Sequence, residues 1–363
     1  MIDFIPGKYY KDIFYFGLWL VVIVAIFHTQ ILKHDSQKAI GFNTVAGWLL
    51  FISVFALIGF RPIDGAFIDM TTYAHIFQRY QFGNYSIESD YGFNYFILGC
   101  TKIMTVEWFF TVCAIIYIVP LFLVSKKWFP NYYFYAFLLF VASMSFFAYG
   151  TNGIRNGMAT SLFIMALYFY RSNTALMIFF FVLAYSFHNS LLLAIAAFIV
   201  SFFLTDTKKY YFFYLFAILL SITMGGIWEN LFASLGFGDD RFANYLTKSA
   251  DASRFASTGF RYDFLLYSAA PILLSFNYKY IKGYESVIYT RILNTYIIAN
   301  GFWVMVIRAN YSNRFAYLSW FLMAIVIFYP VLDKQLWNDQ FKKLGYIIFL
   351  YFFFTYFIMY LLR

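Results

Sequence analysis

Long uninterrupted apolar runs recur along this chain, and they constrain its fold more than any other feature. Residues 18–27 form such a run near the start, and residues 347–354 form another near the end. A helix that crosses a bilayer needs about 20 mostly apolar residues, so these runs predict transmembrane helices. The strands of a membrane β-barrel would instead alternate strictly over about 10 residues.

Charge supports the same interpretation, because only 12% of the 363 residues are charged. A soluble domain carries about 25%, and a chain this poor in charge would not cover a water-facing surface. The sequence therefore predicts an all-α, polytopic transmembrane helical bundle. Hydropathy places about twelve spans, at residues 12–32, 43–60, 107–125, 131–149, 153–170, 173–187, 189–204, 209–225, 261–280, 288–307, 313–331 and 343–362.

We interpret residues 1–363 as a single integral membrane domain with two long connections, at 61–106 and 226–260. The predicted spans 173–187 and 189–204 are short and meet at His188, which predicts either a helical hairpin or one broken helix. Within the first long connection, a short apolar segment at 91–103 is a candidate re-entrant helix.

Lysines mark alternate short connections, and in the twelve-span arrangement they all fall on one side. Because positively charged short loops stay in the cytoplasm, that side is predicted to be cytoplasmic. Both long connections and both chain termini then face outward. The lysines are Lys33, Lys38, Lys126, Lys127, Lys208, Lys209, Lys279, Lys282, Lys334, Lys342 and Lys343.

Arginines concentrate on the opposite, outer side. The planar fork of arginine binds phosphate at two points, which lysine cannot do. The rule that positively charged loops stay in the cytoplasm disfavours arginines on the outer side. The set therefore predicts a function that binds anions on the outer face. Snorkelling to the headgroups is the alternative for any one of them. The set is Arg61, Arg79, Arg155, Arg241, Arg254, Arg261, Arg308 and Arg314.

Two short blocks carry the strongest candidates for chemistry. Arg155 opens an apolar span, where a charge costs several kcal/mol unless it is paired or faces water; the alternative is a helix-end arginine that reaches the headgroups. Gly153 and Gly157 flank it and permit close helix contact. His188 lies between two apolar stretches, where a neutral imidazole can accept a proton or form a helix–helix hydrogen bond.

Three further blocks contain polar residues at helical spacing. In the first long connection, Asp69 and Tyr73 are four apart and share a face, after Arg61 and before the acidic segment 88–93. A solvated loop is the alternative for this block. The second long connection and a late turn hold the remaining pairs: Arg241 and Tyr245, and Arg308 and Arg314.

Several common catalytic motifs are absent from the sequence. We find no DxD, HExxH, P-loop or GxSxG pattern, so a nucleotide site, a divalent-metal site and a hydrolase elbow lack support. No connection on the lysine side is large enough for a nucleotide-binding domain. An enzyme with this sequence would take a lipid-borne donor and need neither metal nor cofactor.

Taken in order, these blocks resemble the EpsG-like branch of Wzy-type bacterial polysaccharide polymerases over roughly residues 55–330. The family shows an Arg followed by Asp and Tyr, then an acidic residue before a Gly-aromatic stretch, a Gly-Ile-Arg-x-Gly block and Phe-His-x-Ser. It also shows an Arg-aromatic-x-x-Tyr block and an Arg at a late span. The matching positions here are Arg61, Asp69, Tyr73, 88–93, 152–157, 187–190, 241–245 and Arg314. The family's Gly-Thr-Asp-Tyr run is loosened here to residues 68–73.

The resemblance implies a GT-C-type, metal-independent glycosyltransferase in the bacterial inner membrane, with its active site facing the periplasm. It would transfer a growing O-antigen, capsule or exopolysaccharide chain from undecaprenyl pyrophosphate to a lipid-linked repeat unit. Arg155 would stabilise the pyrophosphate leaving group, and His188 or Asp69 would deprotonate the acceptor hydroxyl. The implied substrate-binding residues are Arg61, Tyr73, Arg241, Tyr245, Arg308 and Arg314.

The same resemblance implies interactions with undecaprenyl-pyrophosphate-linked oligosaccharides and membrane lipid, with a chain-length regulator and a flippase as protein partners, and none with nucleic acid. A flippase or other transporter is the first alternative, although it predicts internal repeats and charges through the bilayer depth. A membrane O-acyltransferase is the second, and it predicts a cytoplasmic acyl-donor path. The third, a non-enzymatic scaffold, gives no role to Arg155.

Overall fold

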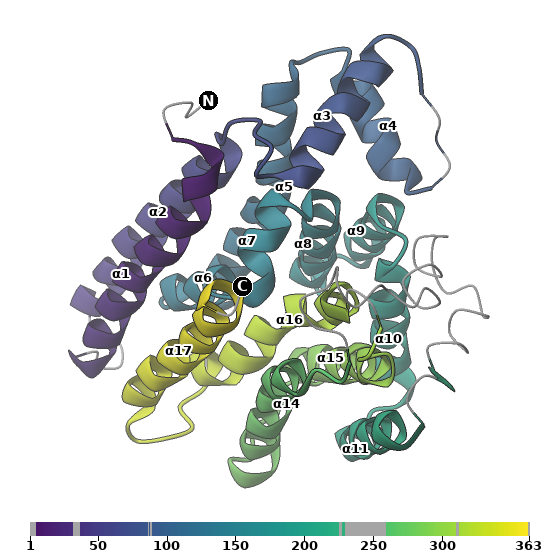
Figure 1. Ribbon diagram of the computed structural model, residues 1–363. Helices are drawn as coiled ribbons and strands as arrows, with labels where there is room; N and C mark the ends of the chain where they lie inside the picture. The colour runs from purple at the N-terminus through teal and green to yellow at the C-terminus, as the bar shows by residue number, and fades with distance from the viewer. Residues whose placement is uncertain are drawn as a thin grey trace. The chain divides into compact units, whose positions relative to one another are not determined.

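Helices make up almost all of the computed structural model (Figure 1). The structure describes residues 5–31, 37–85, 87, 89–224, 227–228, 259–309 and 312–361, and no strand occurs within these ranges. Two compact units divide the chain. The first contains Met1–His188 and Val331–Arg363, and the second contains Asn189–Pro330.

The first unit is built mainly from nine helices and the C-terminal helix, with a short 3₁₀ turn at Gly7–Tyr9 and a π turn at Phe357–Leu361. Apolar side chains fill its interior; residues 134–142 of α6 and its C-cap are all buried. The helices are α1 (Tyr10–Ile31), α2 (Gln37–Gly59), α3 (Ile68–Gln81), α4 (Tyr91–Cys100), α5 (Val106–Trp128), α6 (Tyr133–Val141), α7 (Met144–Thr151), α8 (Ile154–Phe169), α9 (Thr174–Phe187) and α17 (Gln340–Tyr356).

The second unit contains α10 (Leu191–Phe203), α11 (Thr207–Met224), α14 (Tyr262–Phe276), α15 (Val287–Met305) and most of α16 (Ser312–Asp333), with a π turn at Asn277–Ile281. Polar side chains join these helices inside the apolar core. The amide of Asn300 accepts from Tyr214 at 3.0 Å and donates to Ser319 at 2.8 Å. The Asn300 amide thus has a partner on both of its polar atoms, as burial in an apolar interior favours.

Membrane-spanning character is confirmed, but the structure does not support twelve spans. Within the described residues, five helical segments are long and apolar enough to cross a bilayer: Gly7–Ile31, Ile40–Gly59, Val106–Trp128, Phe315–Asp333 and Gln340–Leu361. A sixth is counted if α6 and α7 form one span bent by 68°. The described part of the chain is therefore that of a helical membrane protein with fewer full-length spans than hydropathy indicates.

Short helices account for much of this difference. The predicted span 153–170 is the 16-residue α8, and α9 and α10 have only 14 and 13 residues. At 1.5 Å per residue, each is shorter than the hydrocarbon core of about 30 Å. The chain breaks between α9 and α10 at His188, as the sequence indicated.

The first long connection is not an irregular loop. Its amphipathic stretch forms α3, and its short apolar segment forms α4. The second long connection, 226–260, lies almost entirely outside the described residues. The single-domain organisation and the outward orientation of both connections stay predictions.

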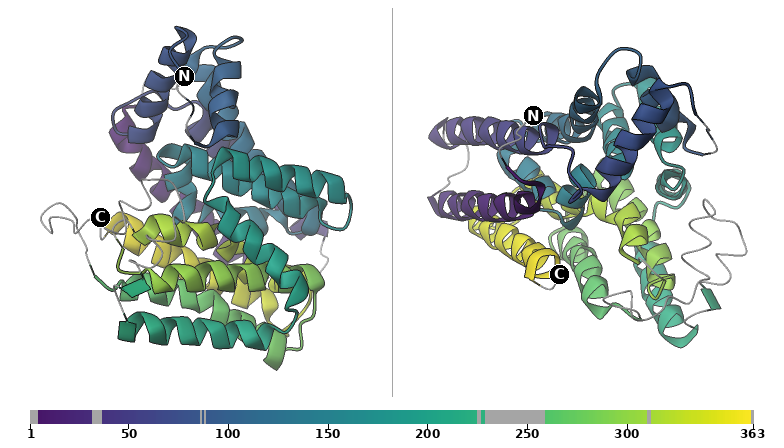
Figure 2. Two further views of the ribbon diagram at one scale, coloured as in Figure 1. Left: turned by 90° about the vertical axis from the view of Figure 1, so that its right-hand side faces the viewer. Right: turned by 45° about the horizontal axis from the view of Figure 1, so that its top comes forward.

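Two opposite ends can be recognised in the first unit. At one end, the start of α1 meets the segment after α2, where Tyr10 packs edge-on against Phe67 at 5.5 Å. Helix α17 lies alongside α1 (Figure 2), and Tyr360 donates to Asp12 at 2.8 Å at the same end. At the other end, His28 of α1 contacts Tyr135 of α6.

Helices α5 and α8 run in the same direction between these ends. Midway along α8, Ser161 donates to the Tyr117 carbonyl of α5 at 2.6 Å. Near its end, the Lys127 ammonium of α5 donates to the Tyr168 carbonyl at 2.5 Å. Arg155, in the first turn of α8, therefore lies at the opposite end of the helix from Lys127.

Candidate active site

One carboxylate, that of Asp90, lies between the two residues that the sequence singled out most strongly. Arg155 forms an ion pair with Asp90 Oδ2 through its Nη1. His188 Nδ1 lies 3.6 Å from Asp90 Oδ1, which is ion-pair range and slightly beyond a hydrogen bond. The Asp90 side chain is 3% exposed, against 17% for Arg155 and 20% for His188. We call these three residues the polar cluster.

Each member of the polar cluster occupies a helix end. Arg155 lies in the first turn of α8, His188 is the C-cap of α9, and Asp90 is the N-cap of α4. A cation is disfavoured at a helix N-terminus by the helix dipole, so the Asp90 carboxylate compensates Arg155 where the backbone does not. An imidazolium at the end of α9 would be favoured by the same dipole.

Backbone geometry fixes the Asp90 carboxylate. Asp90 is left-handed, with φ 47° and ψ 51°, a conformation that costs a non-glycine residue energy. Asn94, one turn later, holds this turn in place. Its amide donates to the Ser89 carbonyl at 2.8 Å and accepts from the Tyr80 hydroxyl of α3 at 2.8 Å. The surrounding contacts thus support a strained residue at the candidate site.

Glycines bring the supporting helices close together. A Cβ added to Gly157 of α8 would meet the Cβ and carbonyl oxygen of Tyr149 at 3.0 Å. A Cβ on Gly92 of α4 would collide with the Ser186 hydroxyl of α9. The close contact that the sequence predicted at Gly157 is present, and α4 and α9 approach in the same way beside Asp90 and His188.

Edge-on aromatic contacts link Tyr73 to the residue that precedes His188. Tyr73 of α3 packs edge-on against Phe93 of α4 at 5.0 Å, and Phe93 packs against Phe187, the residue before His188, at 6.1 Å. Asp69 lies one turn before Tyr73, in the first turn of α3, and is half-buried. The predicted base Asp69 and the predicted substrate-binding Tyr73 therefore share a helix that packs on the cluster.

Arg61 is placed differently, because it is buried to 2% exposure just beyond the end of α2. Its guanidinium donates to the Ile58 carbonyl and lies against the rings of Phe67 and Phe110, at 5.6 and 6.0 Å. Burial lowers the pKa of Arg61 to about 10, so the side chain stays charged at neutral pH. The carboxyl end of α2 stabilises this charge.

A small cavity of about 10 Å³ adjoins Arg61 and is also lined by Tyr149 and Ile154. Its volume is the room of about one water molecule, so in this conformation it does not admit a phosphate. The Arg61 guanidinium instead links the end of α2 to Phe67, before α3, and to Phe110 of α5. Its predicted role in substrate binding stays a prediction.

The remaining predicted residues belong to the second unit. Arg308 follows α15, donates to the Ser221 carbonyl at 2.6 Å and lies 5.2 Å from the centre of the Phe260 ring. Arg241 and Tyr245 lie outside the described residues, as does the side chain of Arg314. Their predicted roles in substrate binding are therefore neither supported nor opposed by the structure.

Asp90 is the candidate site residue that sequence reasoning missed. In the sequence it lies within the acidic segment 88–93, where no single residue indicates a role. Its local signal is an acidic residue directly before a Gly-aromatic stretch and an apolar helix. The partners Arg155 and His188 lie 65 and 98 positions away in sequence (155 − 90 and 188 − 90), so spacing alone does not reveal them.

The polar cluster combines an imidazole, a carboxylate that can orient it, and a guanidinium. This set can move a proton and stabilise a developing negative charge. Across the ranges given above, no three His, Cys, Asp or Glu side chains gather as a metal site. Metal independence itself stays a prediction.

The described residues thus define a helical membrane protein in which an imidazole, a carboxylate and a guanidinium meet at helix ends. Comparison with protein families then identifies the group. The sequence model of the EpsG family matches residues 44–363, and the chain belongs to the EpsG family. No curated protein and no solved structure matches the chain. The matched region contains every candidate site residue, so the resemblance drawn from the short motifs is confirmed.

Proposed function

We propose that this protein is a polysaccharide polymerase that joins lipid-linked repeat units. The donor would be a growing glycan on undecaprenyl pyrophosphate, and the acceptor a single repeat unit on the same carrier. Membership of the EpsG family supports an exopolysaccharide-related activity. The observation that carries the reaction is the polar cluster, in which Asp90 contacts both Arg155 and His188.

The reaction breaks the bond between the anomeric carbon of the donor and a pyrophosphate oxygen, and that oxygen keeps the electron pair. An acceptor hydroxyl oxygen forms the new bond to the anomeric carbon. Its proton passes to Nε2 of His188, whose Nδ1 faces Asp90. The products are the lengthened glycan on the acceptor carrier and free undecaprenyl pyrophosphate.

Arg155 supplies the charge that the leaving group needs. Preorganised cationic donors stabilise a developing oxyanion strongly in a site that excludes water. Asp90 neutralises part of the Arg155 charge and fixes its direction. The family resemblance further assigns substrate binding to Arg61, Tyr73, Arg241, Tyr245, Arg308 and Arg314. Asp69 is the alternative base.

We place the protein in the bacterial inner membrane with the polar cluster facing the periplasm. The position of Lys127 and Arg155 at opposite ends of α8 supports this orientation, because lysine-rich turns stay in the cytoplasm. We further propose a GT-C-like arrangement of the helices. A chain-length regulator and a flippase are the proposed protein partners. The proposed reaction requires neither cofactor nor nucleic acid.

Substitutions of His188 and Arg155 test the proposal in membranes supplied with lipid-linked single repeats. His188→Gln keeps some hydrogen bonding but cannot accept a proton, so chain growth should stop and single repeats accumulate. Arg155→Lys keeps the charge but loses the fork, so it should fail almost as badly as Arg155→Ala. Removing such a donor slows the reaction by roughly 10²–10³-fold.

Matched controls separate chemistry from folding. His75 is an exposed histidine on α3, and Arg171 is an exposed arginine just beyond the far end of α8. His75→Gln and Arg171→Lys should polymerise at wild-type rate. Near wild-type polymerisation by His188→Gln would make His188 a structural residue and move the role of base to Asp69. If the wild-type protein yields glycans no longer than the repeat units supplied, that result would favour a transporter.

A further inference from the structure

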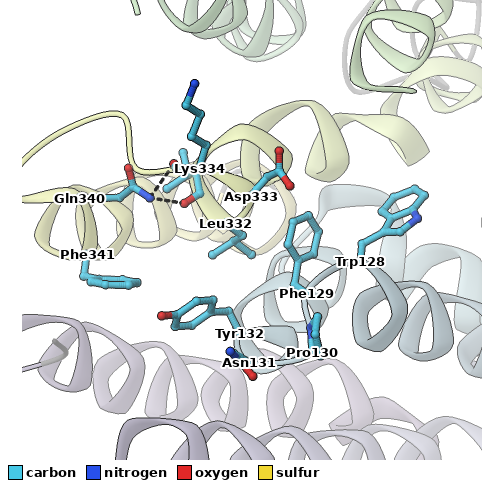
Figure 3. Close-up of a pocket in the computed structure, with 11 residues that line it drawn as sticks. Trp128, Phe129, Pro130, Asn131, Tyr132, Leu332, Asp333, Lys334, Gln340 and Phe341 are labelled. Atoms are coloured by element: carbon cyan, nitrogen blue, oxygen red, sulfur yellow. Dashed lines mark hydrogen bonds between the residues drawn. The ribbon is translucent and has the colours of Figure 1, made fainter. Parts of the chain in front are cut away.

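Two cavities in the first unit differ in the charge that faces them. The larger, of about 230 Å³, lies between the α5–α6 turn and the α16–α17 turn (Figure 3). Lys334 is the one cation among its lining residues, and its side chain extends away from the rings of Tyr132 and Phe341. The smaller cavity, by contrast, has the buried side chain of Arg61 in its wall. A buried cation beside a cavity points to an anion as the ligand.

The Arg61 guanidinium has few partners for a group made entirely of hydrogen-bond donors. It is 2% exposed, and within the described residues only its Nη1 donates a hydrogen bond, to the Ile58 carbonyl. Its Nε is buried and has no acceptor there. Buried polar groups almost always have a hydrogen-bond partner, and an ion or a water molecule supplies it where the protein does not.

The charge of Arg61 is only partly compensated by the protein. The groups that act on it electrostatically are the thiol of Cys113 and the phenol of Tyr10, which are both neutral at pH 7. The carboxyl end of α2 supplies about half a negative charge. The rings of Phe67 and Phe110, at 5.6 and 6.0 Å, lie near the limit of a cation–π contact. Part of a positive charge therefore remains in an apolar interior, where an unpaired charge is strongly disfavoured.

The cavity beside Arg61 has room for one small particle. Its volume of about 10 Å³ corresponds to about one water molecule. Phe110, Ala114 and Ile154 give it apolar walls. A phosphate or a carboxylate group does not fit, whereas a single-atom anion such as chloride is comparable in size with water. The dimensions therefore restrict the ligand to a water molecule or a halide ion.

The start of α8 favours the halide over water. Ile154, the first residue of α8, lines the cavity. The first N–H groups of a helix have no acceptor within it, and Gly153, the N-cap, has no side chain to accept from them. These N–H groups and the positive end of the helix dipole attract anions. The guanidinium and the helix start belong to different parts of the chain, and both favour negative charge in this cavity.

We propose that this cavity binds a single chloride ion, held by the Arg61 guanidinium and the first N–H groups of α8. The ion would complete the compensation of the Arg61 charge and fix the end of α2 to the start of α8. The family resemblance assigns Arg61 to substrate binding, but in this conformation its cavity excludes a pyrophosphate. Chloride binding does not depend on the polymerase reaction.

Thermal melting of the purified full-length protein in detergent tests the site, with sodium chloride compared with sodium gluconate at equal ionic strength. Gluconate is too large for the cavity. Chloride should raise the melting temperature by roughly 2–4 °C at about 100 times its dissociation constant, and the larger iodide should raise it less. Arg61→Met should melt at the same temperature in both salts. Arg171→Met, which changes an exposed arginine, is the matched control and should keep the chloride response.

A second pair of variants tests the location of the ion and does not require Arg61→Met to fold. Cys113 lines the cavity, so Cys113→Ala removes a sulfur atom and gives the ion more room. Iodide should then stabilise this variant at least as well as chloride does. Cys100→Ala is the matched control, because Cys100 is a buried cysteine of α4 that does not line the cavity. It should keep the wild-type preference for chloride.

Three outcomes would overturn the proposal. Equal melting temperatures of the wild-type protein in chloride and gluconate would show that the cavity takes up water and not an anion. A chloride response in Arg61→Met as large as that of the wild type would place the ion at another site. A preference for chloride in Cys113→Ala as strong as in Cys100→Ala would show that the ion does not lie in this cavity.

Discussion

Replacing Asp90 by Asn removes one charge from the polar cluster and leaves its shape almost unchanged. Asn tolerates the left-handed conformation seen at φ 47° at least as well as Asp, so the substitution adds no backbone strain. The Asn oxygen can still accept from Arg155. Its amide nitrogen then faces Nδ1 of His188 as a donor, in place of the Oδ1 atom at 3.6 Å.

This exchange reverses the tautomer of His188. With a donor opposite Nδ1, the neutral imidazole carries its proton on Nε2, the nitrogen that must accept the acceptor's proton. General base catalysis contributes about 10²–10⁴-fold, so Asp90→Asn should slow polymerisation by that factor. The activation free energy rises by about 3–5 kcal/mol, since each tenfold loss of rate corresponds to about 1.4 kcal/mol. The free energy of unfolding should fall by less, about 1 kcal/mol, because Arg155 then donates to a neutral amide oxygen in place of a carboxylate.

In vitro polymerisation of lipid-linked repeats measures the rate, and the melting temperature in detergent measures stability. Asp90→Ala is the companion variant. It lacks the acceptor for Arg155 and places Ala in the left-handed conformation, which costs roughly 1–2 kcal/mol more, so it should melt below Asp90→Asn. The double variant Asp90→Asn/His188→Gln should be no slower than His188→Gln alone, because residues that act as a unit are not additive. Polymerisation by Asp90→Asn within threefold of wild type would refute the tautomer argument.

Two further predictions concern packing and orientation. Gly157→Ala should destabilise the protein by about 1–3 kcal/mol and slow polymerisation, because the added Cβ would lie 3.0 Å from Tyr149, two residues after Arg155. Gly17→Ala is the control. A Cβ on Gly17 meets nothing within 4 Å, so this variant should be neutral or stabilising in the same melting assay. The orientation can be tested with single cysteines on a background without Cys100 and Cys113. In cells with a permeabilised outer membrane, a cysteine at position 127 should resist a membrane-impermeant label, and Arg79→Cys should react with it. Labelling of position 127 would contradict the proposed orientation.

The helical membrane class could be predicted from the sequence because it depends on apolar composition, and apolar residues are abundant along the whole chain. The number of full-length spans could not, because hydropathy reports apolar content but not where a helix breaks. The predicted span 131–149 contains a break after α6, at Ala142, where neither Gly nor Pro signals it. At His188, by contrast, polar residues mark the break.

The candidate site was predicted in the same uneven way. Arg155 and His188 stood out because a polar residue is costly between apolar stretches, whatever its partner. Asp90 did not stand out, since an acidic residue in a long connection is usually solvated. Its burial depends on α4 packing against α9 through Gly92. Only the tertiary contact converts an ordinary acidic residue into the centre of the polar cluster.

Arg61 has a consequence for how the protein is made. Its charge is sheltered by Phe110 of α5, which leaves the ribosome about 50 residues after it (110 − 61 = 49). At 5–20 residues per second, α2 waits roughly 2–10 s before that ring is available. During this interval only the Ile58 carbonyl and the Phe67 ring are available to shelter the guanidinium. The final seating of α2 is therefore a late step in biogenesis, completed only when α5 has entered the bilayer beside it.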